Sequence, residues 1–90
     1  MRIQRSTKKG KRFMVTFENG VTTHFGQAGG KTYIDEGDKA KRTAYLKRHE
    51  PNEDWNDPYS AGALSRWLLW GDSKDLETNH ISFMKKFKVR

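Results

Sequence analysis

Histidines and carboxylates are the residues of this sequence with the widest chemical repertoire. The three histidines fall in separate parts of the chain, at His24, His49 and His80. No two of them are four residues apart, which is the spacing that places two zinc ligands on one helix face. Glu53, Asp54 and Asp57 could join His49 in a hydrolytic metal centre. Helix capping and contact with water, however, account for Glu53 and Asp57 without a metal.

The local motifs of common enzymes are also missing. The chain has no cysteine, which excludes a disulfide framework and a thiolate metal site. It contains no Gly-x-Ser-x-Gly segment, no zinc motif and no nucleotide-binding loop. We therefore expect a protein that is not an enzyme and that carries no metal and no cofactor.

The basic residues indicate a different chemistry, the binding of a polyanion. Eighteen Lys and Arg against eleven Asp and Glu give a formal net charge of +7. The cations gather in residues 1–12, 39–48 and 85–90, where no acid interrupts them. Such a distribution suits nucleic-acid backbones, an acidic protein or an anionic membrane surface, although it would also serve solubility alone. The candidate residues for contacts with a partner or with phosphate are Arg5, Lys8, Lys9, Lys11, Arg12, Lys39, Lys41, Arg42, Lys47, Arg48, Arg66, Lys85 and Lys86.

The aromatic residues must build most of the core, because only 33% of the chain is hydrophobic. All three tryptophans lie within residues 55–70. We expect Trp67 and Leu68 to pack in the core, whereas Trp55 either caps the core or stands exposed as a contact residue. The candidate aromatic contacts with a partner are Trp55, Tyr59 and Trp70. The longest apolar run has four residues, whereas a membrane span needs roughly 18. We therefore expect no membrane-spanning segment.

The N-terminal half predicts a small antiparallel sheet. Residues 13–25 form a β-hairpin pattern around Asn19-Gly20, a pair that favours the tight hairpin turn. Residues 1–12 are either a flexible basic arm or an edge strand of the same sheet. The glycine-rich segment 26–32 reads as a flexible crossing to the helices, with an anion-binding loop as the alternative.

Residues 38–87 predict three short helices. Asp38 can cap the first helix and Pro51 ends it, while Asp57 followed by Pro58 is typical of a second helix start. The third helix should begin near Asp72 or Ser73. Its buried stripe consists of Leu76, His80, Phe83, Met84 and Phe87. A histidine on such a stripe is more often a core residue than a ligand. The fold class we predict is α+β, a single domain over residues 1–90.

The centre of the chain resembles a family of small uncharacterised proteins of large double-stranded DNA viruses and aquatic phages. The shared pattern is Tyr-x-x-Arg-His, then Asn-Glu-Asp-Trp-x-Asp-Pro, then Ala-Gly-x-x-Ser-Arg-Trp-x-Leu-Trp. The matching residues are Tyr45, Arg48, His49, Asn52 to Trp55, Asp57, Pro58, Ala61, Gly62, Ser65, Arg66, Trp67, Leu69 and Trp70. The hairpin end "HFGQAG" and the terminal "FMKKFKV" also fit the layout of that family.

The resemblance implies a virus-encoded protein and leaves its mechanism open. Together with the absence of a catalytic pattern, it favours a non-enzymatic minor capsid or cement-type component of the virion, with larger capsid proteins, DNA or both as partners. The alternative is a sequence-independent nucleic-acid-binding protein that acts in the interior of the infected host cell. The sequence predicts no particular oligomeric state.

Overall fold

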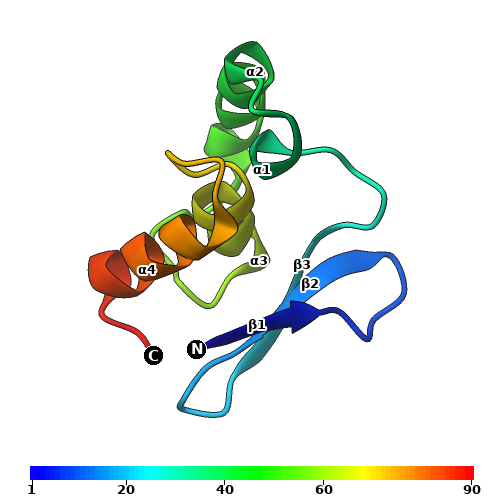
Figure 1. Ribbon diagram of the computed structural model, residues 1–90. Helices are drawn as coiled ribbons and strands as arrows, with labels where there is room; N and C mark the ends of the chain where they lie inside the picture. Colours follow the sequence, from blue (N-terminus) through cyan, green and yellow to red (C-terminus); the bar gives the residue numbers. More distant parts are fainter.

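The computed structural model describes all 90 residues and confirms the α+β fold, a three-stranded antiparallel sheet followed by helices (Figure 1). The strands are β1 (Arg2–Arg5), β2 (Lys11–Thr16) and β3 (Thr22–Gln27), in the order β1-β2-β3. The helices are α1 (Tyr33–Glu36), α2 (Lys39–His49), the 3₁₀ turn η1 (Glu50–Asn52), α3 (Ala61–Leu64), the π-helical η2 (Ser65–Leu69) and α4 (Leu76–Phe87).

The hairpin between β2 and β3 forms as predicted. Gly20 has a φ of 90°, and the amide of Phe17 donates to the carbonyl of Val21 at 2.8 Å. The register places Phe13 opposite Phe25, and the two rings lie 5.9 Å apart. The inward face of the sheet therefore carries aromatic side chains that pack against the helices.

Residues 1–12 are folded, which settles the choice between an arm and an edge strand. β1 pairs with β2 along its length, with Ile3 opposite Val15. Ile3 packs against the core. At the other end of the chain, Val89 packs against the same core, and the carbonyl of Arg90 accepts a hydrogen bond from the amide of Glu18. The basic residues at both ends of the chain thus belong to the folded body.

Three predictions about the helices need correction. The second helix begins at Ala61, because Ser60 caps it by accepting from the amide of Ala63 at 3.1 Å. Asp57 instead closes a turn, accepting from the amide of Tyr59 at 3.0 Å. The last helix begins at Leu76 and is capped by Asp75, later than the predicted start.

The third correction is α1, a one-turn helix that we did not expect. Thr32 and Asp35 form a reciprocal capping box at its start. The first long helix, α2, does follow its predicted signals, since the side chain of Asp38 accepts from the amides of Ala40 and Lys41. Helix α1 therefore adds to the three helices predicted for residues 38–87.

The core lies between the sheet and the helices α3, η2 and α4. Its largest fully buried side chains are Val15, Phe25, Leu64, Leu68, Leu69 and Phe83. Leu68 is fully buried, as expected. Trp67 packs against the core but is only partly buried, and its ring meets Phe87 edge-on, with the centroids 6.3 Å apart. Trp55 is also half-buried. No helix of this fold has both the length and the apolar character that a bilayer crossing requires.

Candidate functional site

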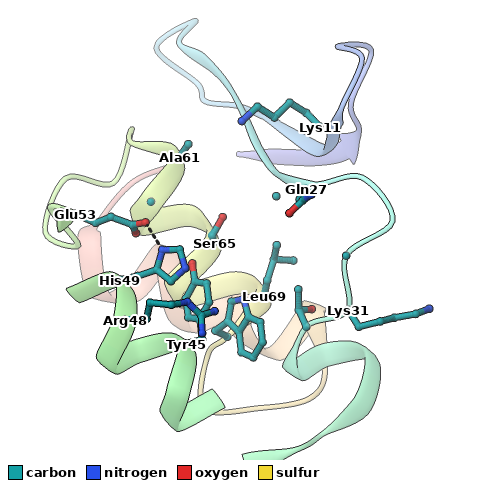
Figure 2. Close-up of a pocket in the computed structure, with 15 residues that line it drawn as sticks. Lys11, Gln27, Lys31, Tyr45, Arg48, His49, Glu53, Ala61, Ser65 and Leu69 are labelled. Atoms are coloured by element: carbon teal, nitrogen blue, oxygen red, sulfur yellow. Dashed lines mark hydrogen bonds and ion pairs between the residues drawn. The ribbon is translucent and has the colours of Figure 1, made fainter. Parts of the chain in front are cut away.

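A cleft of about 380 Å³ opens where the end of the sheet faces α2 and the α3–η2 helix (Figure 2). One wall comes from α2, through Tyr45, Arg48 and His49. These residues stand at positions i, i+3 and i+4, so they share one face of the helix. The adjoining wall comes from Gly62 and Ser65. Lys11 and Gln27 from the sheet, with Lys31 and Thr32 from the glycine-rich segment, close the third side.

His49 and Glu53 form the polar pair of the cleft. His49 Nδ1 lies 2.8 Å from Glu53 Oε1, and the indole nitrogen of Trp55 donates to Glu53 Oε2 at 3.0 Å. Both carboxylate oxygens therefore have a partner within the protein. Gly62 makes this arrangement possible, because a Cβ there would lie 2.7 Å from Glu53 Oε2. The pairing directs Nδ1 of His49 away from a ligand and leaves its other nitrogen as the one available to the cleft.

A column of three stacked rings supports this pair. Tyr45 lies parallel to Trp70, with ring centroids 4.3 Å apart, and its other face stacks on His49 at 4.2 Å. Burial, followed by the nearby charge of Glu53, raises the pKa of Tyr45 to about 12. The phenol is therefore neutral at physiological pH and keeps its proton as a hydrogen-bond donor.

The cleft is rimmed by cations. Figure 2 shows the side chain of Lys11 reaching across the opening toward Ala61, while Arg48 lies on the opposite wall beside Tyr45. Lys31 is at the edge and directs its ammonium group outward. None of these three cations forms an ion pair, since the ion pairs of the structure involve Arg12, Lys41, Arg42 and His49. Lys11 and Arg48 thus line a cleft whose single carboxylate, Glu53, is already hydrogen-bonded, and Lys31 adds a cation at its edge.

Two of the predicted phosphate-binding residues serve α1 instead. Arg12 makes a two-pronged contact with the carboxylate of Asp35, at 2.7 Å for each nitrogen. This contact, ahead of the bonds from Thr32, holds the pKa of Asp35 well below its usual range. Lys41 pairs with Glu36 at 2.8 Å. A guanidinium that is held in this way presents little of its charge to a partner.

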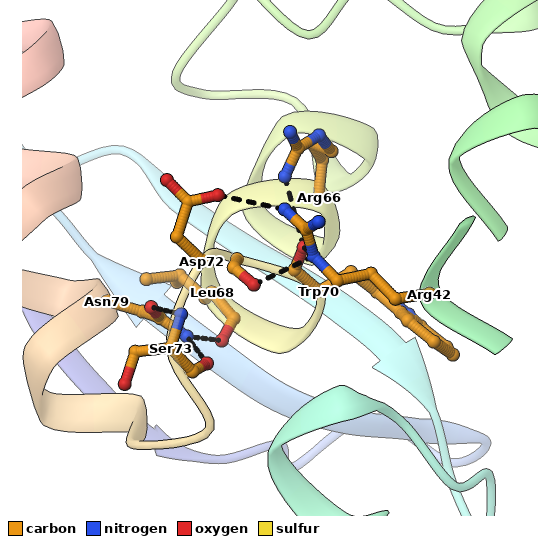
Figure 3. Close-up of polar contacts among 8 residues, drawn as sticks. Arg42, Arg66, Leu68, Trp70, Asp72, Ser73 and Asn79 are labelled. Atoms are coloured by element: carbon orange, nitrogen blue, oxygen red, sulfur yellow. Dashed lines mark hydrogen bonds and ion pairs between the residues drawn. The ribbon is translucent and has the colours of Figure 1, made fainter. Parts of the chain in front are cut away.

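Two further arginines cap the end of η2 (Figure 3). The carbonyl of Trp70 accepts from Arg42 Nε at 3.1 Å and from Arg66 at 3.0 Å. Arg42 also bonds the carbonyl of Gly71 and pairs with Asp72. Cations at the carboxyl end of a helix satisfy its free carbonyls and oppose its dipole. Arg42 and Arg66 therefore have a structural role, whatever else they contact.

The other predicted cations are distributed over the surface. Arg5, Lys8, Lys9, Lys39, Lys47 and Lys85 are exposed, as is Lys86, whose ammonium group lies 4.4 Å from the ring centroid of Trp67. The turn that carries Lys8 and Lys9 lies against the glycine-rich segment, because the amide of Ala28 donates to the carbonyl of Gly10 at 3.0 Å. These two lysines lie on this turn and do not line the cleft.

The aromatic contact candidates separate into different environments. Tyr59 is 38% exposed and meets Phe17 edge-on. Trp55 is half-buried, with its indole N–H bonded to Glu53 and Arg66 5.2 Å from its ring centroid. Trp70 is only 9% exposed and stacks on Tyr45. Trp70 is therefore a core residue whose edge lines the cleft, and it is no surface anchor.

The carboxylates that could have joined a metal centre do not converge. Asp54 Oδ1 accepts from the amide of Asn56 at 2.9 Å, and Asp57 closes its own turn, so both stabilise the loop before α3. No group of three or more His, Asp or Glu side chains is placed to hold a metal ion. His24 meets Ser6 at 2.7 Å. Burial, ahead of repulsion from the N-terminus, lowers the pKa of His80 on α4.

Sequence reasoning named Lys11 and Arg48 but did not place them at one site. It missed Tyr45, Ser65 and Lys31 as lining residues. The spacing of Tyr45, Arg48 and His49 on one helix face was a signal that could have indicated a shared wall. Nothing local in the sequence brings that wall opposite Lys11, which lies in a different element.

Comparison with known proteins identifies a family and no function. Residues 1–49 match the model of a family of unknown function (DUF5754). The matched region contains the sheet, α1 and α2, and so includes Lys11 and the α2 wall of the cleft. No curated protein and no solved structure matches the chain.

Proposed function

We propose that this chain, which belongs to the DUF5754 family of unknown function, is a non-enzymatic protein that binds nucleic-acid backbones without reading their sequence. One observation carries the proposal: the cations around the cleft have no carboxylate partner, while other cations of the chain are occupied within the fold. Lys11, Lys31 and Arg48 make no ion pair, unlike Arg12 and Arg42.

Lys8 and Lys9 are further cations without a carboxylate partner. The β1–β2 turn brings Lys8 and Lys9 beside the glycine-rich segment, and Arg48 lies across the cleft from Lys11. Unpaired cations neutralise phosphates and release their counterions, which gives affinity without base contacts. The faces of the Tyr45 ring are both covered by other rings. Base stacking on Tyr45 is therefore a weaker source of binding than charge.

The salt dependence of DNA binding tests this proposal. The affinity for a short duplex should fall steeply between about 50 and 200 mM NaCl, with a logarithmic slope near −0.9 for each phosphate contacted. Replacing Lys8 and Lys9 by Gln should reduce that slope by about 2 and weaken all sequences equally. Lys85→Gln is the charge control, because α4 lies on the other side of the molecule from the β1–β2 turn (Figure 1).

Two results would remove the proposal. Absence of binding at low salt would show that the cations only keep the protein in solution. An equal loss of DNA affinity in the Lys8→Gln, Lys9→Gln double variant and in a variant with two Lys→Gln changes on α4 would also contradict it. Binding would then follow the net charge of the protein and not the position of the cations.

We also propose a location for this activity, a particle of a DNA virus in which the chain is a minor capsid or cement-type component. The support is the resemblance of the centre of the chain to small proteins of DNA viruses and phages. Inside a particle, the basic face would meet packaged DNA or acidic surfaces of larger capsid proteins. Binding to the native state alone would also stabilise a small domain.

Mass spectrometry of purified particles tests the location. Peptides of the chain should copurify with the particles at a constant ratio to the major capsid protein. Abundance in infected cells together with absence from particles would contradict the structural role and would favour nucleic-acid binding in the host cell.

A further inference from the structure

We infer that the cleft between Lys11 and Arg48 is a binding site for a terminal phosphate group, the phosphate monoester of a nucleotide or of a nucleic-acid strand end. The inference rests on the proposed polyanion binding and assigns it a specific pocket. The two cations project from opposite walls, Lys11 from the start of β2 and Arg48 from α2 (Figure 2). Neither forms an ion pair within the protein.

The only carboxylate that lines the cleft does not oppose an anion strongly. Glu53 is bonded through one oxygen to His49 and through the other to the indole of Trp55. Its charge is therefore shared with two donors that turn its oxygens away from a ligand. The titratable residues that line the cleft are Lys11, Lys31, Tyr45, Arg48, His49 and Glu53. The ammonium group of Lys31 points outward, so Lys11 and Arg48 are the two cations set against the one carboxylate of the cleft.

The uncharged donors of the cleft also suit phosphate oxygens. Ser65, at the start of η2, lines the cleft, and Gln27 adds a side-chain amide from the end of β3. Phosphate oxygens accept several hydrogen bonds at once, and Arg presents its donors in a planar fork that matches them. Carboxylate ligands offer fewer acceptors for the same set of donors.

The shape of the cleft favours a chain end over the interior of a strand. Its volume of about 380 Å³ is at the small end of the range of about 300–1,000 Å³ for ligand pockets. A monoester also carries about −1.5 to −2 charges, which corresponds to the pair of cations better than the single charge of an internal phosphodiester.

The ring column opposes the main alternative, a base stacked on Tyr45. Tyr45 has His49 on one face and Trp70 on the other, with centroid distances of 4.2 and 4.3 Å. Inserting a base against Tyr45 would require the column to open and Trp70 to leave the core. The cleft therefore holds the phosphate, and the sugar and base point outward.

The test compares ligands that differ only in the terminal phosphate. Adenosine monophosphate and adenosine are titrated into ¹⁵N-labelled protein, and a single-stranded decamer is titrated with either a 5′-phosphate or a 5′-hydroxyl. We expect the monophosphate, and not adenosine, to shift the amides of Gln27, His49 and Ser65. The phosphorylated decamer should bind about tenfold more tightly than the hydroxyl form.

Variants connect this difference to the cleft. The double variant Lys11→Gln with Arg48→Gln should abolish the preference for the phosphorylated decamer, and Arg48→Lys, which keeps the charge, should retain part of it. Lys85→Gln should leave the preference unchanged. The NMR spectrum of each variant reports whether it folds, so a folding defect in the double variant leaves Arg48→Lys and the wild-type ligand pairs as the test.

The outcomes separate this inference from the proposed function. Binding of the monophosphate without salt-dependent binding of DNA would support the cleft with a free nucleotide as its ligand, and would remove the broader proposal. Salt-dependent binding of both decamers with equal affinity would overturn the cleft site and leave backbone binding in place. Shifts confined to residues outside the cleft would also overturn it.

Discussion

Asn79 is a buried polar side chain whose hydrogen bonds fasten α4 to the loop that follows η2. Its side-chain nitrogen donates to the carbonyls of Leu68 and Ser73, at 3.0 and 2.8 Å, and its oxygen accepts from the amide of Ser73 at 3.1 Å (Figure 3). Asn79 is 3% exposed, so no water replaces these bonds. The side-chain nitrogen and oxygen of Asn79 therefore both have hydrogen-bond partners within the protein.

Asn79→Ala should destabilise the fold by about 2–4 kcal/mol, because it leaves buried carbonyls and an amide without partners. Urea unfolding measures the change in the free energy of unfolding. Asn56→Ala, at an exposed turn position, is the control and should have an effect within about 0.5 kcal/mol. Equal effects of the two changes would mean that the loop rearranges and recovers its hydrogen bonds.

Elements whose boundaries are set by neighbouring residues were predicted correctly. Elements whose boundaries depend on tertiary contacts were not. Asn19-Gly20 specifies the hairpin turn and Asp38 caps α2 within a few residues of sequence. Asp57 and Ser60 both offer a valid cap for the next helix. The hydroxyl of Thr23 on β3 bonds the carbonyl of Tyr59 at 2.7 Å, which holds the segment before Ser60 in a turn. Thr23 and Tyr59 are 36 residues apart, so the sequence around residue 57 does not predict this contact.

The candidate site was harder to predict than the fold for the same reason. Lys11 and Arg48 could be named as phosphate-binding candidates from charge alone. Their separation across a cleft depends on how β2 and α2 pack, and the partners that occupy Arg12 and Arg42 lie 23 and 30 residues away along the chain. Composition therefore identified the class of ligand, while the selection among equivalent cations required the tertiary structure.

Helix α1 is fastened to the sheet by the contact between Arg12 and Asp35, which makes the attachment of this element sensitive to acid. The pKa of Asp35 is lowered in the folded state by Arg12. A carboxyl group with a depressed folded pKa stabilises the protein above its unfolded pKa of about 4, and that stabilisation disappears as the pH falls below it. Stability from this pair is thus complete at neutral pH and decreases on acidification.

Asp35→Asn should cost about 1–2 kcal/mol at pH 7, because the bidentate charged contact and the capping box are both weakened. The difference from wild type should shrink as the pH is lowered toward about 3, where the wild-type carboxyl becomes protonated in the unfolded chain. Urea unfolding at both pH values measures it. Asp72→Asn is the control, since the side chain of Asp72 is 92% exposed and such a pair contributes little. If the difference in the free energy of unfolding between Asp35→Asn and wild type did not change with pH, the packing of α1, and not the ion pair, would account for the lost stability.

The charge of the whole molecule acts on stability and on binding in opposite directions. A formal net charge of +7 on 90 residues is confined to a body with a radius of gyration of 12.2 Å. Mutual repulsion among the unpaired cations opposes this compact state, and the unfolded chain relieves it by expanding. Salt at ordinary concentrations has a Debye length of about 8–10 Å, which is shorter than the dimensions of the molecule, so it screens the repulsion.

Raising NaCl from about 10 to about 150 mM should therefore increase the melting temperature of the free protein by about 2–5 °C, while it weakens the binding of DNA. Calorimetry in a buffer without phosphate measures the first effect and a titration with duplex measures the second. In the Lys8→Gln, Lys9→Gln double variant both salt effects should become smaller, because fewer cations repel each other and fewer contact phosphate. A melting temperature that falls with NaCl would mean that attractive contacts, such as those of Asp35 and Glu36, outweigh the repulsion among the cations, and the basic surface would then be balanced within the fold instead of being free for a polyanion.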